Sequence, residues 1–69
     1  MQMTYDRAAD VLTFLVRPML PVDAIEEPGG VIISYGQDGE PVSVEFLNAA
    51  KRGLVELGNL NVTLTTSPS

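Results

Sequence analysis

The sequence predicts a small α+β domain, a four-stranded antiparallel β-meander followed by one short C-terminal helix. The sheet is indicated by short runs of β-branched and aromatic residues, which glycine, proline and aspartate interrupt. The helix is indicated by leucine and alanine at helical spacing after residue 47. A chain of 69 residues is long enough for one domain, which we place at residues 1–58, with residues 59–69 as a tail.

The first two strands are predicted at residues 1–5 and 11–16. Residues 1–5 alternate apolar and polar side chains, as a half-buried strand does. Residues 11–16 are apolar on both faces, which is typical of a central strand. The polar connection between them contains Asp6, whose carboxylate can accept hydrogen bonds from backbone amides ahead of it. We therefore expect an antiparallel pair.

The segment 17–30 contains three prolines, and its residues 22–26 could supply an edge strand. Asp23, Glu26 and Glu27 make this part of the chain acidic. One interpretation is a solvated segment that keeps a sheet edge from pairing with other chains. The alternative is a divalent-cation site, because hard cations prefer several convergent oxygen ligands.

A second hairpin is predicted from residues 31–35 and 42–47, which flank Asp38-Gly39. This dipeptide is a strong turn signal because both residues tolerate positive φ. Within the second run, Val44 and Phe46 share one face and Ser43 points to the other. We expect the strands to follow one another in sequence order, with 11–16 and 31–35 at the centre of the sheet.

The short helix is predicted to begin at Asn48, whose side chain suits the N-cap, and to end at Gly58. Gly53 weakens it, so the helix needs packing to persist. Its apolar stripe consists of Leu47, Ala50, Leu54 and Leu57. Residues 59–66 alternate again and could add a strand to their own sheet or to that of a partner.

The charge, the apolar runs and the missing residue types limit the classes of function that this chain can have. Nine acidic and four basic residues give a net charge of −5, which disfavours binding to nucleic-acid phosphates. No apolar run approaches the length of a membrane helix, and we expect a soluble cytoplasmic protein. The chain has no cysteine and no histidine, so disulfides, thiolate zinc sites and the commonest general base are excluded.

Association is the remaining way for so small a chain to gain stability, and we expect a homodimer. One helix covers only part of one sheet face, so a second copy is the simplest cover for the rest. The residues assigned to the dimer interface or core are Met3, Tyr5, Leu12, Phe14, Ile33, Val44, Phe46, Leu54, Leu57 and Val62.

No constellation for chemistry is evident. Serine and threonine residues on the predicted strands lack a neighbouring base. Tyr5 could hydrogen-bond Asp6 or Asp10, but we interpret the ring as core and the carboxylates as turn residues. We therefore assign no catalytic, cofactor or metal residue. The interpretation we favour is a protein-interaction module with a basic partner. Two alternatives rank below the interaction module. One is a ligand- or metal-binding domain that uses the acidic 23–27 segment or an intersubunit cleft, and the other is an enzyme.

Several motifs occur in a recognisable order: Tyr5-Asp6-x-x-Ala9-Asp10 before a strand, Gly30-Val-Ile-Ile, Asp38-Gly39 and Val44-Glu-Phe-Leu-Asn-Ala-Ala-Lys-Arg52. Together they resemble the bacterial family known as domain of unknown function 2283, over roughly residues 1–54. The resemblance implies a small meander with a C-terminal helix and brings no established activity. Some members lie beside small toxin-like proteins, so it also implies an antitoxin-like role. Gly36-Gln37 departs from the family pattern, which usually has acidic residues there.

Overall fold

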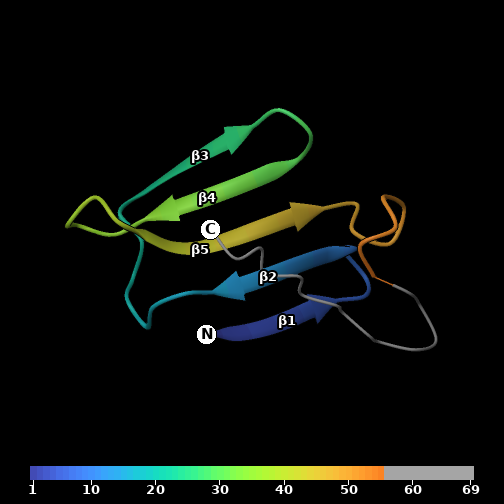
Figure 1. Cartoon of the computed structure of the whole chain (residues 1–69), viewed down its shortest axis with the longest axis horizontal. Coiled ribbons are helices and arrows are strands. Elements are labelled where there is room, and N and C mark those ends of the chain that lie inside the picture. Colours follow the sequence, from blue (N-terminus) through green and yellow to red (C-terminus); the bar gives the residue numbers. More distant parts are fainter. Residues whose placement is uncertain (56–69) are drawn as a thin grey trace, which may run out of the picture.

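The computed structural model describes residues 1–55 and shows one five-stranded antiparallel sheet (Figure 1). The sheet order is β1-β2-β5-β4-β3. The strands are β1 (Gln2–Asp6), β2 (Val11–Leu15), β3 (Asp23–Glu27), β4 (Val31–Tyr35) and β5 (Pro41–Leu47). Within residues 1–55, no helix is long and apolar enough to cross a membrane.

The predicted antiparallel pair of the first two strands is confirmed, with Thr4 opposite Thr13. The predicted strand order is wrong, because β5 lies at the centre and separates β2 from β4 (Figure 1). The acidic segment 23–27 explains the difference: it forms a full edge strand beside β4. With β5 on its other side, β4 has no free edge left for β2, and β2 pairs with the open edge of β5 instead.

The predicted helix after residue 47 is also wrong, so the fold is not α+β in the described part of the chain. Residues 48–53 form successive turns, and residues 54–55 form a bend. Asn48 has φ 55°, which is left-handed and differs from the extended backbone of an N-cap. Gly53 is left-handed too, at φ 76°, and it breaks any helical continuation. Residues 56–69, which include Leu57, Gly58, Val62 and the predicted tail strand, lie outside the described residues.

The loop of the β4–β5 hairpin consists of residues 36–40. It is longer than a two-residue turn, as the presence of Gly36 and Pro41 suggests. The Gly36 amide donates to the Glu40 carbonyl at 2.9 Å, and Gly39 has φ 81°. The register shifts between Ser34 and Tyr35, which marks a bulge. An added Cβ on Gly36 would lie 3.1 Å from Val42, so this buried turn position has little room for a side chain.

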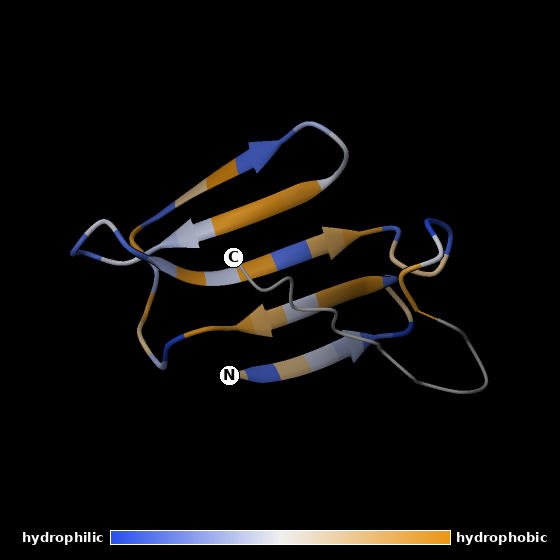
Figure 2. Ribbon diagram, in the orientation of Figure 1, coloured by the Kyte–Doolittle hydropathy of each residue, from blue (hydrophilic) through white to orange (hydrophobic). Residues whose placement is uncertain are grey.

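The two faces of the sheet differ in chemistry. Cross-strand register places Tyr5 opposite Leu12, Leu12 opposite Phe46, and Val44 opposite both Phe14 and Ile33. Directly opposed residues share a face, so these six residues define one surface, here called the aromatic face. The opposite face is mixed, because Thr13, Ser43 and Glu45 lie on it together with Val11, Leu15 and Ile32. Figure 2 shows the alternation of hydrophobic and hydrophilic colours along β5.

The main core cluster lies at one end of the aromatic face. Leu12, Ala49 and Val55 are buried together, and Tyr5, Phe14 and Phe46 pack against them. The turns that follow β5 therefore supply Ala49 and Val55 to the core, in the region of the chain where a helix was predicted. Other large apolar side chains remain exposed, including Met3 (43%), Val16 (43%) and Ile25 (46%).

Candidate functional site

Asp10 joins two turns that are far apart in the sequence, through both its side chain and its backbone. Its Oδ1 accepts a 2.7 Å hydrogen bond from the Tyr5 hydroxyl and another of 2.7 Å from the Ala50 amide. Its own carbonyl accepts from the Ala49 amide at 3.0 Å. Asp10 has φ 57°, a left-handed conformation that aspartate tolerates better than most residues. This residue ties the β1–β2 turn to the turns after β5.

The pKa shifts of Asp10 and Tyr5 indicate a structural role for this pair. The Ala50 amide and then the Tyr5 hydroxyl lower the pKa of Asp10, because both stabilise the carboxylate. The same carboxylate raises the pKa of Tyr5. A general base needs a pKa near the working pH, and these shifts move both groups away from neutrality. Asp6, the other carboxylate of the turn, accepts hydrogen bonds from the Ala8 and Ala9 amides, as its position suggested.

A second polar group joins the end of β2 to the β4–β5 turn. Arg17 forms a bidentate pair with Asp38, at 2.7 and 3.0 Å, and also donates to the carbonyls of Glu40 and Pro41. The Arg17 guanidinium lowers the pKa of Asp38 to about 2, with help from the Glu40 amide. This pair holds the β4–β5 turn in place, and the hydrogen-bonding groups of Arg17 are used within it.

The Arg17–Asp38 pair predicts a pH dependence of stability. Asp38 has an ordinary pKa of about 3.9 in an unfolded chain, and its pKa is about 2 in the folded chain. The pair therefore stabilises the protein fully above about pH 4 and loses that contribution as the pH falls towards about 2. The effect is small, because 49% of the Asp38 side chain is exposed.

Thermal melts between pH 6 and pH 2 test this expectation. The melting temperature of the wild-type chain should fall more steeply below about pH 4 than that of Asp38→Asn, which has no carboxylate to protonate. Other carboxylates act equally in both proteins, so the difference between the two curves isolates Asp38. Parallel curves would show that the ion pair does not stabilise the fold.

The acidic segment does not gather its carboxylates at one point. It is an exposed strand, and strand alternation places Glu26 on the opposite face from Asp23 and Glu27. Among residues 1–55, no three acidic side chains are grouped closely enough to hold a metal ion. The geometry gives no support to the cation interpretation of this segment.

The concave feature that stands out lies on the aromatic face. A hollow of about 260 Å³ is lined by Met1, Phe14, Val16, Val44 and Phe46. The two phenylalanine rings meet edge to face, with centroids 5.9 Å apart and an interplanar angle of 85°. Every lining side chain is apolar, so the hollow suits an apolar side chain of another molecule and offers no group for chemistry.

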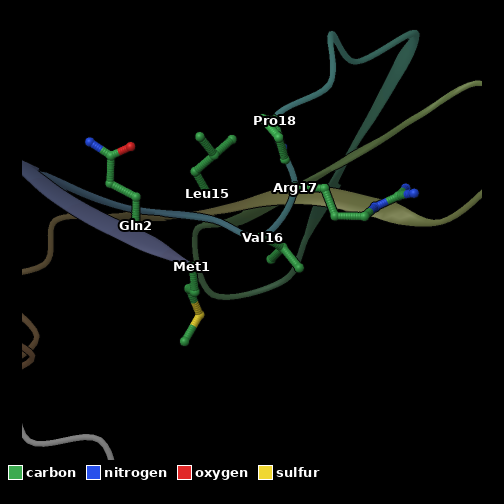
Figure 3. A pocket seen from close by; sticks show the side chains of 6 residues that line it. All are labelled: Met1, Gln2, Leu15, Val16, Arg17 and Pro18. Carbon is green, nitrogen blue, oxygen red and sulfur yellow. The ribbon is translucent and has the colours of Figure 1, made fainter.

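A second, smaller hollow of about 200 Å³ lies at the margin of the sheet, around the start of β1 and the end of β2 (Figure 3). Its side chains do not converge. Gln2 and Leu15 point to one side of the sheet, whereas Met1 and Val16 point to the other, as Figure 3 shows. The residues around this hollow lie on both faces at the edge of the sheet, so they do not form a single binding site.

The residues predicted for the interface or core divide into three groups. Leu12 is buried, Tyr5, Phe14, Ile33, Val44 and Phe46 are half-buried on the aromatic face, and Met3 and Leu54 are exposed. Leu57 and Val62 lie outside the described residues. Sequence reasoning missed Ala49 and Val55 as core residues, and it missed the hydrogen bonds that the Ala49 and Ala50 amides donate to Asp10. The left-handed residue pair, Asp10 and Asn48, offered a weak signal, because aspartate and asparagine are enriched in that conformation.

The fold and its surface define a class: a small antiparallel sheet whose polar clusters hold turns and whose apolar face is partly open. A family model described as "Protein of unknown function (DUF2283)" matches residues 2–49, more than half of the chain. The chain belongs to this family, and the resemblance seen in the sequence is confirmed. The matched region includes all five strands. Neither the curated proteins nor the solved structures include a match.

Proposed function

We propose that this chain is a non-catalytic interaction module, antitoxin-like or regulatory, that binds a basic protein partner in the cytoplasm through its aromatic face. The observation that supports this most directly is the apolar hollow between Phe14, Val44 and Phe46. An apolar cavity open to solvent is typical of a surface that accepts an anchoring side chain from another protein.

The charge around this face favours a basic partner. Asp23 and Glu27 lie on the same side of the sheet as the hollow, on edge strand β3. The chain as a whole carries a net charge of −5. Such a field accelerates encounter with a positively charged protein and repels acidic ones. We therefore expect a partner that presents an apolar side chain surrounded by lysine or arginine.

A matched pair of variants tests the surface. Val16→Asp places a charge at the rim of the hollow, on a side chain that is already 43% exposed. Gln2→Asp makes the same change in net charge at a neighbouring exposed position whose side chain points to the opposite side of the sheet (Figure 3). We expect Val16→Asp to weaken partner binding at least about tenfold, a loss of about 1.4 kcal/mol, and Gln2→Asp to leave it nearly unchanged.

The measurement begins with capture from native cells on immobilised wild-type chain, followed by titration of the purified partner against each variant. A basic protein whose affinity falls with added salt and with Val16→Asp, but not with Gln2→Asp, is the expected result. A partner that binds all three chains equally, or one that is acidic, would refute the proposal. Thermal melts of both variants verify that each is folded.

A further inference from the structure

The sheet has two outer strands, β1 and β3, and among residues 1–55 each is paired on one side only. An outer strand presents unpaired amides and carbonyls, which can pair with a strand of another molecule. Proteins usually block such edges with charged side chains or proline. The two edges of this sheet differ sharply in that respect.

Strand β3 is blocked. Three of its five residues are acidic, and Pro21 and Pro28 flank it closely. If two copies paired along β3, the fullest antiparallel register would centre on Ile25. That register would set Asp23 directly against the partner's Glu27, twice across the two-fold axis. Like charges directly opposite are destabilising, so this edge resists pairing with itself.

Strand β1 is open. It contains no proline, and its one charged residue, Asp6, lies at its end. Gln2, Met3 and Thr4 are exposed, and none of their side chains carries a charge. Nothing in this strand's own sequence opposes the approach of a second strand of the same kind.

We propose that β1 is a dimerisation edge, where the β1 strand of a second copy pairs antiparallel about a two-fold axis at Thr4. Directly opposed residues share a face, so the axis must pass through a residue position and not between two. Centring on Thr4 pairs the whole of Gln2–Asp6. Met3 then opposes the partner's Tyr5, and Gln2 opposes the partner's Asp6. Both contacts are favourable, and no like charges meet.

This arrangement joins two five-stranded sheets side by side and places both aromatic faces on the same side. The contact is narrow, well below the roughly 800 Å² per partner of a standard interface. We therefore expect a reversible dimer, with a dissociation constant of about 1 to 100 µM. It is separate from the partner site, because the hollow between Phe14 and Phe46 stays open in the dimer.

Introduced cysteines test the proposal sharply, because the chain has none of its own. Thr4→Cys places two thiols opposite each other at the axis, within the range in which a disulfide forms. Ala24→Cys is the matched control: it lies on the same face of the sheet, in the outer strand of the other edge. Both positions are exposed.

Under mild oxidation, we expect most of the Thr4→Cys chain to become a covalent dimer of twice 7.4 kDa, and Ala24→Cys to form no covalent dimer. Sedimentation of the unmodified chain should show reversible association as concentration rises. A single species near 7.4 kDa at about 100 µM would overturn the proposal. So would a dimer in which Thr4→Cys does not cross-link, or equal cross-linking by both variants, since either result would place the contact elsewhere. Far-ultraviolet circular dichroism verifies that both variants are folded.

Discussion

Replacing Leu12 by alanine is expected to lower the free energy of unfolding by about 2–5 kcal/mol. Leu12 is only 3% exposed and packs with Ala49 and Val55 in the one core cluster of the described residues. Truncating it removes apolar contacts and leaves a cavity between the sheet and the turns that follow β5. Because small domains are marginally stable, a loss of this size is a large part of the total.

Leu20→Ala is the matched control, since it makes the same truncation at a side chain that is 88% exposed. We expect that variant to change stability by no more than about 0.5 kcal/mol. Urea unfolding followed by circular dichroism measures both. If the two variants unfolded at the same urea concentration, Leu12 would not be part of the core.

Replacing Asp10 by alanine is expected to lower the melting temperature clearly, and replacing it by asparagine is expected to lower it much less. Alanine cannot accept the hydrogen bonds from Tyr5 and Ala50, and it adopts the left-handed backbone at φ 57° less readily. Asparagine keeps an acceptor oxygen and tolerates that conformation.

Tyr5→Phe separates the two contributions, because it removes the hydroxyl donor and leaves the Ala50 bond to Asp10 in place. We expect its melting temperature to lie between those of the wild-type chain and Asp10→Ala. Thermal melts at pH 7 compare all four proteins. Equal melting temperatures for Asp10→Ala and Asp10→Asn would show that the carboxylate position does not anchor the turns.

Local sequence patterns predicted where the strands lie in the chain better than they predicted which strands pair with each other in the sheet. The runs at 1–5, 11–16, 31–35 and 42–47 all correspond to strands, and alternation correctly placed Val44 and Phe46 on one face. The order of strands depends on which edges remain free, and that depended on residues 22–26. Their charge and flanking prolines are poor strand signals, but they suit an edge.

The helix prediction failed because apolar spacing over ten residues is a weak signal when glycine interrupts it. The predicted and observed burial differ at two neighbouring positions. The predicted helix would bury Leu54, but in the structure Leu54 is 39% exposed and Val55 is 3% exposed. Turns follow no 3.6-residue period. What holds them is Asp10, which is 40 positions from Ala50 in the chain, and no local pattern reveals a contact at that distance.

The candidate site was accessible to sequence reasoning only as a set of apolar residues. Alternation along residues 42–47 indicated that Val44 and Phe46 face one way, but the hollow that they form with Phe14 depends on how β2 lies beside β5. The Arg17–Asp38 pair was not foreseen, because its partners come from the end of one strand and a turn 21 positions later. Their closeness is also a product of the β2–β5 pairing.

The central position of β5 has a consequence for how the chain folds. Hairpins β1–β2 and β3–β4 join neighbours in sequence and can form early, whereas the β2–β5 contact must close a long loop, seen in the 2.7 Å bond from the Val16 amide to the Val42 carbonyl. Isolated two-stranded hairpins are marginal in water. Closing distant segments is the slow step for such topologies. We therefore expect a nascent chain to form a stable sheet only after residues 41–47 have left the ribosome, and its apolar strands stay exposed to aggregation until then.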